Sequence, residues 1–440
     1  MQFYIDPGTG SMLFTILVGV LGAGVYACKN LFVKLRFILS GGKKEKGNTE
    51  HLPIVIFSDS KSYWSTFEPI CRELDERGQK AVYMTMSPDD PGLKAEFKNI
   101  RSEFIGEGNK AFAKLNMLDA DIVLSTTPGL DVYQWKRSKN VKYYVHVLHA
   151  ANDVATYRMF GMDYYDAALL SGEFHRQQLR ELEKIRNLPA KDLQLVGLPY
   201  MDELRRKLEE APPMEKEGTT VLLAPSWGPN SIFNRYGGRI FEALLKTGYH
   251  IIVRPHPQSY TSEKELLEKL QAEFPDSDQL EWNSDNDNFE VLRRSDILIS
   301  DFSGVTLDFA LVFDRPIIYT ETEFDKEIYD ASWLEEELWI LTTLPKIGQK
   351  LTEENLPDVK TLIDQCLSEE KYQAAREAAR QETWVNIGKS ASLCADYLIR
   401  KEEELLAEEA REKAEEEKAA KEKAAGRKQR SRKGKEVKGK

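Results

Sequence analysis

The sequence predicts an α/β protein made of two doubly wound halves with parallel sheets that face a common cleft. From Leu52 onward, short apolar runs alternate with amphipathic stretches, which is the pattern of βαβ units. The 440 residues, 41% of them hydrophobic, exceed what one ordinary core needs and suffice for two. A Pro- and Glu-rich stretch, 207–220, separates the alternating pattern into two series.

Each series contains predicted strands joined by predicted helices. The strands of the first series read PIVIFSD, KAVYMTM, ADIVLST, KYYVHVLHA, DAALLSG and LQLVGLP, and those of the second read TVLLAPSW, HIIVRPHP, SDILISD and RPIIYT. Segments such as EFHRQQLRELEKIRN show the helical period. We therefore expect domains at 51–206 and 219–370, closing helices at 371–407 and a charged low-complexity tail at 408–440.

The N-terminal segment 1–50 is predicted to be a membrane anchor with a basic linker. Ser11 to Cys28 contains no charged residue over 18 positions, the lower end of what spans a bilayer. Basic residues follow this run instead of preceding it, which fits a secretory signal peptide less well. By the positive-inside rule we expect a single-pass protein of the cytoplasmic membrane, with its catalytic domains in the cytoplasm.

Composition excludes several other classes of protein. The net charge of −11 argues against nucleic-acid binding. The four cysteines lack the spacing of a disulfide framework or a zinc site, and neither GxxxxGK[ST] nor GxGxxG occurs. SDNDN at 284–288 reads as a turn, so we expect no metal and no cofactor. The charged tail is predicted to be helical or disordered, and to serve as a solubilising segment or as a second contact with an anionic membrane surface.

A polar interruption between two apolar runs, within residues 295–319, is the first candidate site. If a helix starts near Ser303 directly after a strand, the backbone N–H groups of Ser303, Gly304, Val305 and Thr306 are free to bind phosphate. The hydroxyls of Ser303 and Thr306 would add donors, and Gly304 would allow close approach. The alternative is an ordinary N-cap serine before a buried helix.

The preceding strand of the second half ends in VRPHPQS, which supplies Arg254 and His256. The prolines on both sides of the histidine restrict its backbone. His256 can donate a hydrogen bond to a phosphate oxygen, and Arg254 can neutralise a diphosphate. A purely structural histidine is the alternative.

The first half offers VHVLHAANDVATYR, in which a strand ends at His149. His149 can act as general base for an incoming hydroxyl, and Asp153 is available to orient its ring or to serve as an alternate base. We expect His149 to face His256 across the cleft, and His146 to point to the other side of its strand or to be buried. A capping role for His149 is the alternative.

Taken in order, LHAANDV, LLSGEFHR, GLPYMDEL, LLAPSW, VRPHP and SDILISDFSGVTLDFALVFDRPIIY resemble the motif series of the CDP-glycerol glycerophosphotransferase family, the teichoic-acid primases and polymerases. The resemblance covers roughly 142–320. It implies a GT-B-type fold, with a Rossmann-like acceptor domain followed by a Rossmann-like CDP-donor domain. It also implies transfer of glycerol phosphate from CDP-glycerol to a hydroxyl of a lipid-linked or polyol-phosphate acceptor, with release of CMP at the membrane surface.

By position, the resemblance implies that His149 is the base and that His256 is the histidine that holds the diphosphate. It also implies a donor-diphosphate loop that contains Asp301, Ser303, Gly304 and Thr306. This chain departs from the family where LHAAN stands for the usual WHGTP, and where Ser303-Gly304 stands for a pair of serines. These departures affect the acceptor and donor assignments more than the reaction class.

Two other functions remain compatible with the sequence. A nucleotide-sugar glycosyltransferase or epimerase can use the same architecture, because fold does not fix function. A catalytically silent scaffold, tethered to the membrane and binding partners through its tail, is the second. An oligomer is possible in each case.

Overall fold

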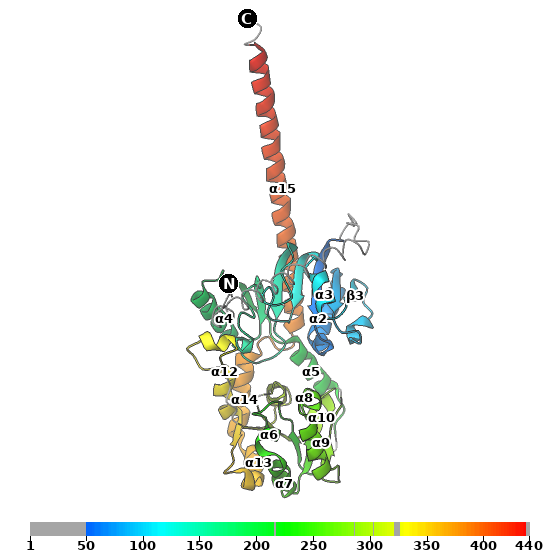
Figure 1. Cartoon of the computed structure of the whole chain (residues 1–440), viewed down its shortest axis with the longest axis vertical. Coiled ribbons are helices and arrows are strands. Elements are labelled where there is room, and N and C mark those ends of the chain that lie inside the picture. Colours follow the sequence, from blue (N-terminus) through cyan, green and yellow to red (C-terminus); the bar gives the residue numbers. More distant parts are fainter. Residues whose placement is uncertain (1–49, 215–216, 286, 302, 321–325, 437–440) are drawn as a thin grey trace, which may run out of the picture. The chain divides into compact units, whose positions relative to one another are not determined.

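The computed structural model describes residues 50–214, 217–285, 287–301, 303–320 and 326–436, with side chains to 419. The predicted membrane anchor lies outside the described residues. Among the helices that the structure describes, none combines the length and the hydropathy needed to cross a bilayer. Two α/β lobes, each built on a parallel sheet, make up the part of the chain from Leu52 onward (Figure 1).

The first lobe contains a seven-stranded parallel sheet in the order β3-β2-β1-β4-β5-β6-β7. Its strands are β1 (Leu52–Ser58), β2 (Ala81–Thr85), β3 (Ile100–Phe104), β4 (Asp119–Ser125), β5 (Asn140–Val147), β6 (Ala167–Leu170) and β7 (Asp192–Leu195). The six predicted strands are present. The edge strand β3, IRSEF, was not predicted, because its three central residues are polar.

Both faces of this sheet are covered, which explains the nearly continuous apolar sequence of its central strands. Val55 and Phe57 of β1 enter one hydrophobic cluster, while Ile54 and Ile56 enter another. The covering elements are α2 (Trp64–Glu76), α3 (Gly108–Leu115), α4 (Glu173–Arg186), α5 (Pro199–Glu210), η1 (Lys61–Tyr63), η2 (Pro91–Leu93) and η3 (Val154–Thr156).

The second lobe contains a six-stranded parallel sheet in the order β10-β9-β8-β11-β12-β13. Its strands are β8 (Thr220–Leu223), β9 (His250–Val253), β10 (Leu280–Trp282), β11 (Ile297–Ser300), β12 (Ile317–Thr320) and β13 (Gly348–Leu351). Four of these were predicted. The two missed strands, β10 and β13, are again edge strands of their sheet.

The helices of the second lobe follow the same doubly wound plan, with residues of β8 entering two clusters on its two faces. They are α6 (Ile232–Tyr236), α7 (Gly238–Leu245), α8 (Ser259–Ser262), α9 (Lys264–Glu273), α10 (Phe289–Arg294), α11 (Val305–Leu307), the π-helical turn η4 (Asp308–Val312), η5 (Asp330–Trp333), α12 (Trp339–Ile347), η6 (Leu356–Asp358) and α13 (Val359–Ser368).

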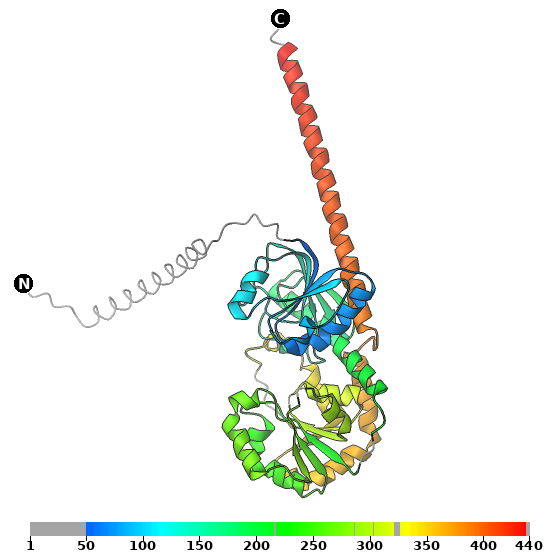
Figure 2. The same ribbon diagram turned by 90° about the vertical axis from the view of Figure 1, so that its right-hand side faces the viewer.

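Two C-terminal helices connect the lobes. α14 (Glu370–Thr383) packs beside α12, and α15 (Ser390–Glu436) returns to the first lobe (Figure 2). Cys394 and Leu398 of α15 are fully buried in the same cluster as Ile54 and Ile56 of β1. The start of α15 is therefore part of the first lobe's core, as expected for a closing helix.

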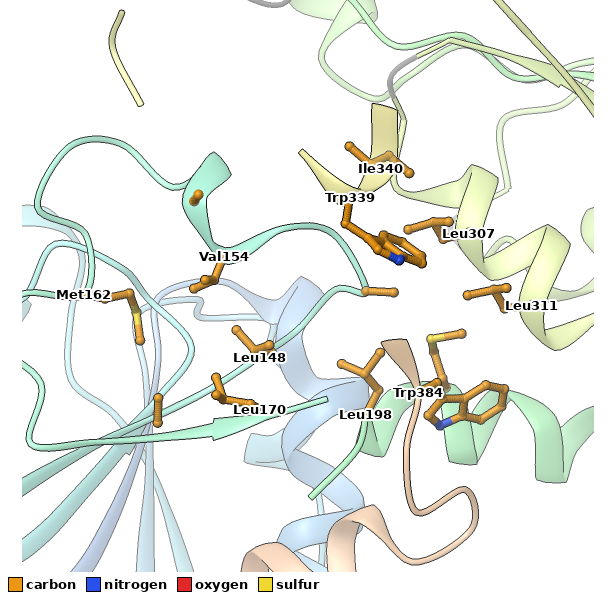
Figure 3. Close-up of a cluster of buried hydrophobic side chains, with 14 of the residues drawn as sticks. Leu148, Val154, Met162, Leu170, Leu198, Leu307, Leu311, Trp339, Ile340 and Trp384 are labelled. Carbon is orange, nitrogen blue, oxygen red and sulfur yellow. The ribbon is translucent and has the colours of Figure 1, made fainter. Parts of the chain in front are cut away.

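A shared hydrophobic cluster holds the two lobes together (Figure 3). Leu148, Val154 and Leu198 come from the first lobe, whereas Leu307 and Leu311 come from the helical segment that follows the predicted donor loop. Burial of this much apolar surface stabilises the contact between lobes. The loop predicted to bind the donor diphosphate, which comprises Asp301 and residues 303–306 and is called the donor loop below, is thus anchored directly to the interface.

Candidate active site

Each sheet has one point where the strand order reverses, and the ligands of such sheets bind beyond the carboxyl ends of the strands there. In the first sheet the reversal lies between β1 and β4, which end at Ser58 and Ser125. In the second sheet it lies between β8 and β11, which end at Leu223 and Ser300. His149 follows β5, the strand beside β4, and the predicted donor loop follows β11.

The His149 ring is held by three side chains. Its Nδ1 lies 2.7 Å from the Thr126 hydroxyl, and Thr126 directly follows β4. The ring also packs between Tyr63 and Tyr157, with ring centroids 4.6 and 6.0 Å away. Burial lowers the pKa of His149 to about 4, against the opposing effect of a hydrogen bond to the Thr126 backbone. His149 is therefore neutral near pH 7, as a general base must be.

His146 is fully buried and contacts Tyr157, with its Nε2 3.2 Å from the Tyr157 hydroxyl. Burial holds its pKa well below the ordinary value. The expectation of a buried or oppositely directed His146 agrees with this placement.

Asp153 has a different role from the one expected. Its buried carboxylate accepts hydrogen bonds from the backbone N–H groups of Trp339 (2.7 Å) and Ile340 (3.0 Å), and from the Gln178 amide (2.6 Å). It therefore caps the start of α12 in the opposite lobe. These bonds do not reach His149, so we correct the idea that Asp153 orients that ring: Thr126 contacts it instead.

His256 lies half-buried after β9. Its Nδ1 accepts a hydrogen bond from the Gln258 backbone N–H at 3.1 Å, so the proton of the neutral ring is on Nε2. Burial lowers the pKa of His256, while the nearby carboxylates of Asp301 and Glu263 act in the opposite direction. The structure thus brings His256 into the electrostatic neighbourhood of Asp301, at the adjacent reversal point.

The Arg254 guanidinium is half-buried and bonds to neutral oxygens. It donates to the Asn283 side chain and to the Asp285 carbonyl, the latter at 2.8 Å. Among the described residues, no carboxylate lies within ion-pair distance of it. Burial lowers the pKa of Arg254 without making it neutral at ordinary pH. A positive charge without a bound carboxylate suits an anionic ligand.

Asp301 fixes the shape of the second reversal point. Its buried carboxylate accepts hydrogen bonds from the backbone N–H groups of Ser226 (2.7 Å) and Ile232 (3.1 Å), both on the segment that follows β8. The Ser300 hydroxyl donates to the Ala224 carbonyl on the same segment at 2.7 Å. Asp301 therefore stabilises the positions of the two loops, and both of its carboxylate oxygens already accept hydrogen bonds from the backbone.

The donor loop itself is open at Gly304, where an added Cβ would meet no atom within 4 Å. Across the described residues, the backbone N–H groups of Ser303, Gly304 and Val305 have no acceptor within hydrogen-bond distance. The N–H of Thr306 differs from the expectation, because it donates to the Ser303 carbonyl at 3.1 Å. The Thr306 hydroxyl is buried and lacks a partner in the described structure.

The N-cap of α11 is Gly304, without a side-chain cap, so Ser303 does not act as the ordinary capping serine. His256, Asp301 and the donor loop are grouped by sheet topology and electrostatics within the second lobe. The contacts of His149 and His256 lie within their own lobes, and their convergence on one ligand stays a prediction.

Sequence reasoning missed Thr126 and Tyr63 as partners of His149. Thr126 had one available signal, since it ends the predicted strand ADIVLST, beside the strand that carries His149. Tyr63 had none, because its segment reads as the polar start of a helix.

Two doubly wound lobes, with histidines and polar loops after their strands, give the chain a GT-B-like fold. The model of the CDP-Glycerol:Poly(glycerophosphate) glycerophosphotransferase family matches residues 138–346, slightly less than half of the chain. This segment is therefore similar to that family, in agreement with the resemblance seen in the sequence, and the match supports an enzyme of the CDP-glycerol glycerophosphotransferase type. The match includes His149, Arg254, His256 and the donor loop.

Solved structures share the fold. Two structures of the wall teichoic acid polymerase TagF are 16% and 15% identical, with TM-scores of 0.53 and 0.55; they cover 87% and 88% of this chain and 99% of their own chains. UDP-GlcNAc 2-epimerase from Neisseria meningitidis is 12% identical, with a TM-score of 0.52, and covers 79% of this chain and 100% of its own. No curated protein matches the sequence.

Proposed function

We propose that this protein transfers glycerol phosphate from CDP-glycerol to a hydroxyl of a lipid-linked or polymer acceptor and releases CMP. The observation that carries the proposal is the opposite hydrogen-bonding state of two histidines in the segment matched by the family. His256 Nδ1 accepts from Gln258, which leaves Nε2–H to donate to phosphate. His149 is neutral and contacts Thr126 through Nδ1, which directs Nε2 away as a base.

In the proposed reaction the acceptor hydroxyl oxygen attacks the β-phosphorus of CDP-glycerol. The bond from this phosphorus to the bridging oxygen breaks, and CMP leaves with the electron pair. The hydroxyl proton moves to Nε2 of His149. In-line displacement of this kind depends chiefly on positioning and on stabilisation of charge.

Charge on the diphosphate is stabilised from the second lobe. Arg254 supplies a positive charge, His256 an N–H, and the donor loop the amides of Ser303, Gly304 and Val305. A single well-placed donor contributes about 3 kcal/mol to transition-state stabilisation in other enzymes. Asp301 acts indirectly, since it shapes the loops that carry these groups.

In this proposal the acceptor is located at the membrane surface. The apolar run at 11–28 and the basic residues behind it support anchoring in the cytoplasmic membrane, with both lobes in the cytoplasm. One structure of TagF is described as soaked with CDPG, which supports the same donor class here.

The test uses the full-length protein in detergent, CDP-glycerol labelled in its glycerol, and bacterial membranes as the source of acceptor. We expect label in the lipid or polymer fraction and an equal amount of CMP. The competing function, a nucleotide-sugar enzyme, rests on the fold shared with UDP-GlcNAc 2-epimerase. Release of UDP or epimerisation of UDP-GlcNAc, without turnover of CDP-glycerol, would replace the proposal with that function.

A further inference from the structure

We propose that Thr126 is the positioning residue for His149: its hydroxyl holds Nδ1–H and so leaves the lone pair of Nε2 for the acceptor hydroxyl. This inference rests on the proposed function and extends it to a residue outside the family match, which begins at residue 138. Thr126 directly follows β4 at the reversal point of the first sheet, and its side chain is fully buried.

The hydrogen bonds around Thr126 determine which nitrogen carries the proton. The Thr126 hydroxyl donates its single hydrogen to the Val147 carbonyl at 2.7 Å. Toward His149 Nδ1, at 2.7 Å, the same oxygen can then only accept. Nδ1 must therefore be protonated, and a neutral ring has its lone pair on Nε2.

The orientation of the ring is fixed by different neighbours. Tyr63 and Tyr157 pack near its faces, with interplanar angles of 52° and 31°. Aromatic packing restricts the ring plane but does not distinguish the ring from its flipped form. The hydroxyl of Thr126 supplies that distinction, because it contacts one ring nitrogen only.

The arrangement performs the orienting task that a buried carboxylate performs in hydrolase triads. Here the partner is a neutral hydroxyl that is itself held by a backbone carbonyl. A neutral partner stabilises an imidazolium less than a carboxylate does, which agrees with a ring that stays uncharged near pH 7. Thr126 therefore fixes the orientation and the tautomer of the His149 ring and supplies no charge.

The test compares Thr126→Val, which keeps the shape and removes the hydroxyl, with Thr126→Ser, which keeps the hydroxyl. In the labelled-transfer assay, we expect Thr126→Val to lower kcat by about 10- to 100-fold, the effect typical of lost orienting partners. Binding of CDP-glycerol, measured by calorimetry, should change less than about twofold, and Thr126→Ser should recover most of kcat.

The matched control is Thr247→Val in the second lobe. The buried Thr247 hydroxyl likewise donates to a backbone carbonyl, that of Leu244 at 2.6 Å, and accepts from the Tyr249 backbone N–H at 3.1 Å; in the described part of the chain it has no hydrogen bond to a histidine. We expect it to lose stability to a similar degree and to keep kcat. Equal losses of kcat in both variants would mean that Thr126 acts only through stability, and would overturn the proposal.

A second measurement does not depend on activity. In the full chain labelled with 15N in its histidines, long-range 1H–15N correlations identify the protonated ring nitrogen, and His149→Gln assigns the signal. We expect Nδ1–H in the wild type and a mixture of tautomers in Thr126→Val. Nε2–H in the wild type would overturn the positioning role even if transfer occurs, whereas absent transfer with Nδ1–H present would overturn only the proposed function.

Discussion

Tyr200 donates a hydrogen bond to Asp308 across the two lobes, with a distance of 2.5 Å from its hydroxyl to Oδ1. Tyr200 lies on α5 of the first lobe, and Asp308 begins the π-helical turn that follows the donor loop. Leu307 and Leu311 on either side of Asp308 belong to the cluster between lobes. The segment that starts at the predicted phosphate site is therefore tied to the opposite lobe by one polar and several apolar contacts.

Asp308→Asn should stabilise the protein more at pH 7.5 than at pH 4.5. Burial raises the pKa of Asp308 to about 6, against the lowering effect of the Tyr200 hydrogen bond. A raised carboxyl pKa means that the native state holds its proton between about pH 4 and 6. The stability that this bound proton contributes to the native state is lost as the pH rises through about 6. The amide introduced by Asp308→Asn does not titrate, so the variant has no such loss. We expect a difference of about 1–2 kcal/mol between the two pH values in urea unfolding.

Tyr200→Phe gives the matched comparison for Asp308. Without its donor, the Asp308 carboxylate is harder to ionise, so this variant should lose more stability at pH 7.5 than at pH 4.5. If the two variants, each compared with the wild type, both gained stability or both lost it between pH 4.5 and pH 7.5, a coupling through this hydrogen bond would be contradicted.

His149→Gln should abolish transfer while leaving binding of CDP-glycerol nearly unchanged. In the proposed mechanism, His149 is the base in the first lobe, whereas donor binding is assigned to the second lobe. A loss of kcat of about 100-fold or more is expected for a missing general base. The control is His250→Gln, because His250 begins β9 and so lies at the opposite end of the strand from its carboxyl end. A His149→Gln enzyme with a near-normal rate would rule out His149 as the base.

Arg254→Gln should weaken CDP-glycerol binding by about 10-fold or more, because a charge-assisted hydrogen bond to phosphate is lost. Calorimetric titration of the full-length protein measures this directly. Arg239→Gln removes an exposed arginine of the same lobe, which pairs with Glu353, and should leave the affinity unchanged. Unchanged affinity in Arg254→Gln would place the diphosphate elsewhere.

Asp153→Ala should act on stability and not as the loss of a base. The carboxylate caps α12 through Trp339 and Ile340, so we expect a loss of about 1–2 kcal/mol, with a lower midpoint of unfolding. Transfer activity should persist below that midpoint. If activity disappears while the unfolding midpoint is unchanged, Asp153 has the catalytic role that its contacts do not indicate.

Several predictions made from sequence agree with the structure for one physical reason. Strands buried on both faces of a parallel sheet are nearly continuous apolar runs, so their ends are visible where polar residues begin. This rule located the ends of β5, β9 and β11, and with them His149, His256 and the donor loop. It missed the edge strands β3, β10 and β13, because each of them is only partly buried and mixes polar with apolar residues.

The sequence by itself determined the two-lobed α/β architecture, the resemblance to a family and the positions along the chain of the candidate site residues, since all of these follow from local patterns. The tertiary structure decided the partners. Thr126 lies 23 positions before His149 and Asp153 lies 186 positions before Trp339, and each pair meets only through strand order or the packing of the lobes. Hydrogen bonds between such distant residues depend on which elements become neighbours, and no local pattern records that choice.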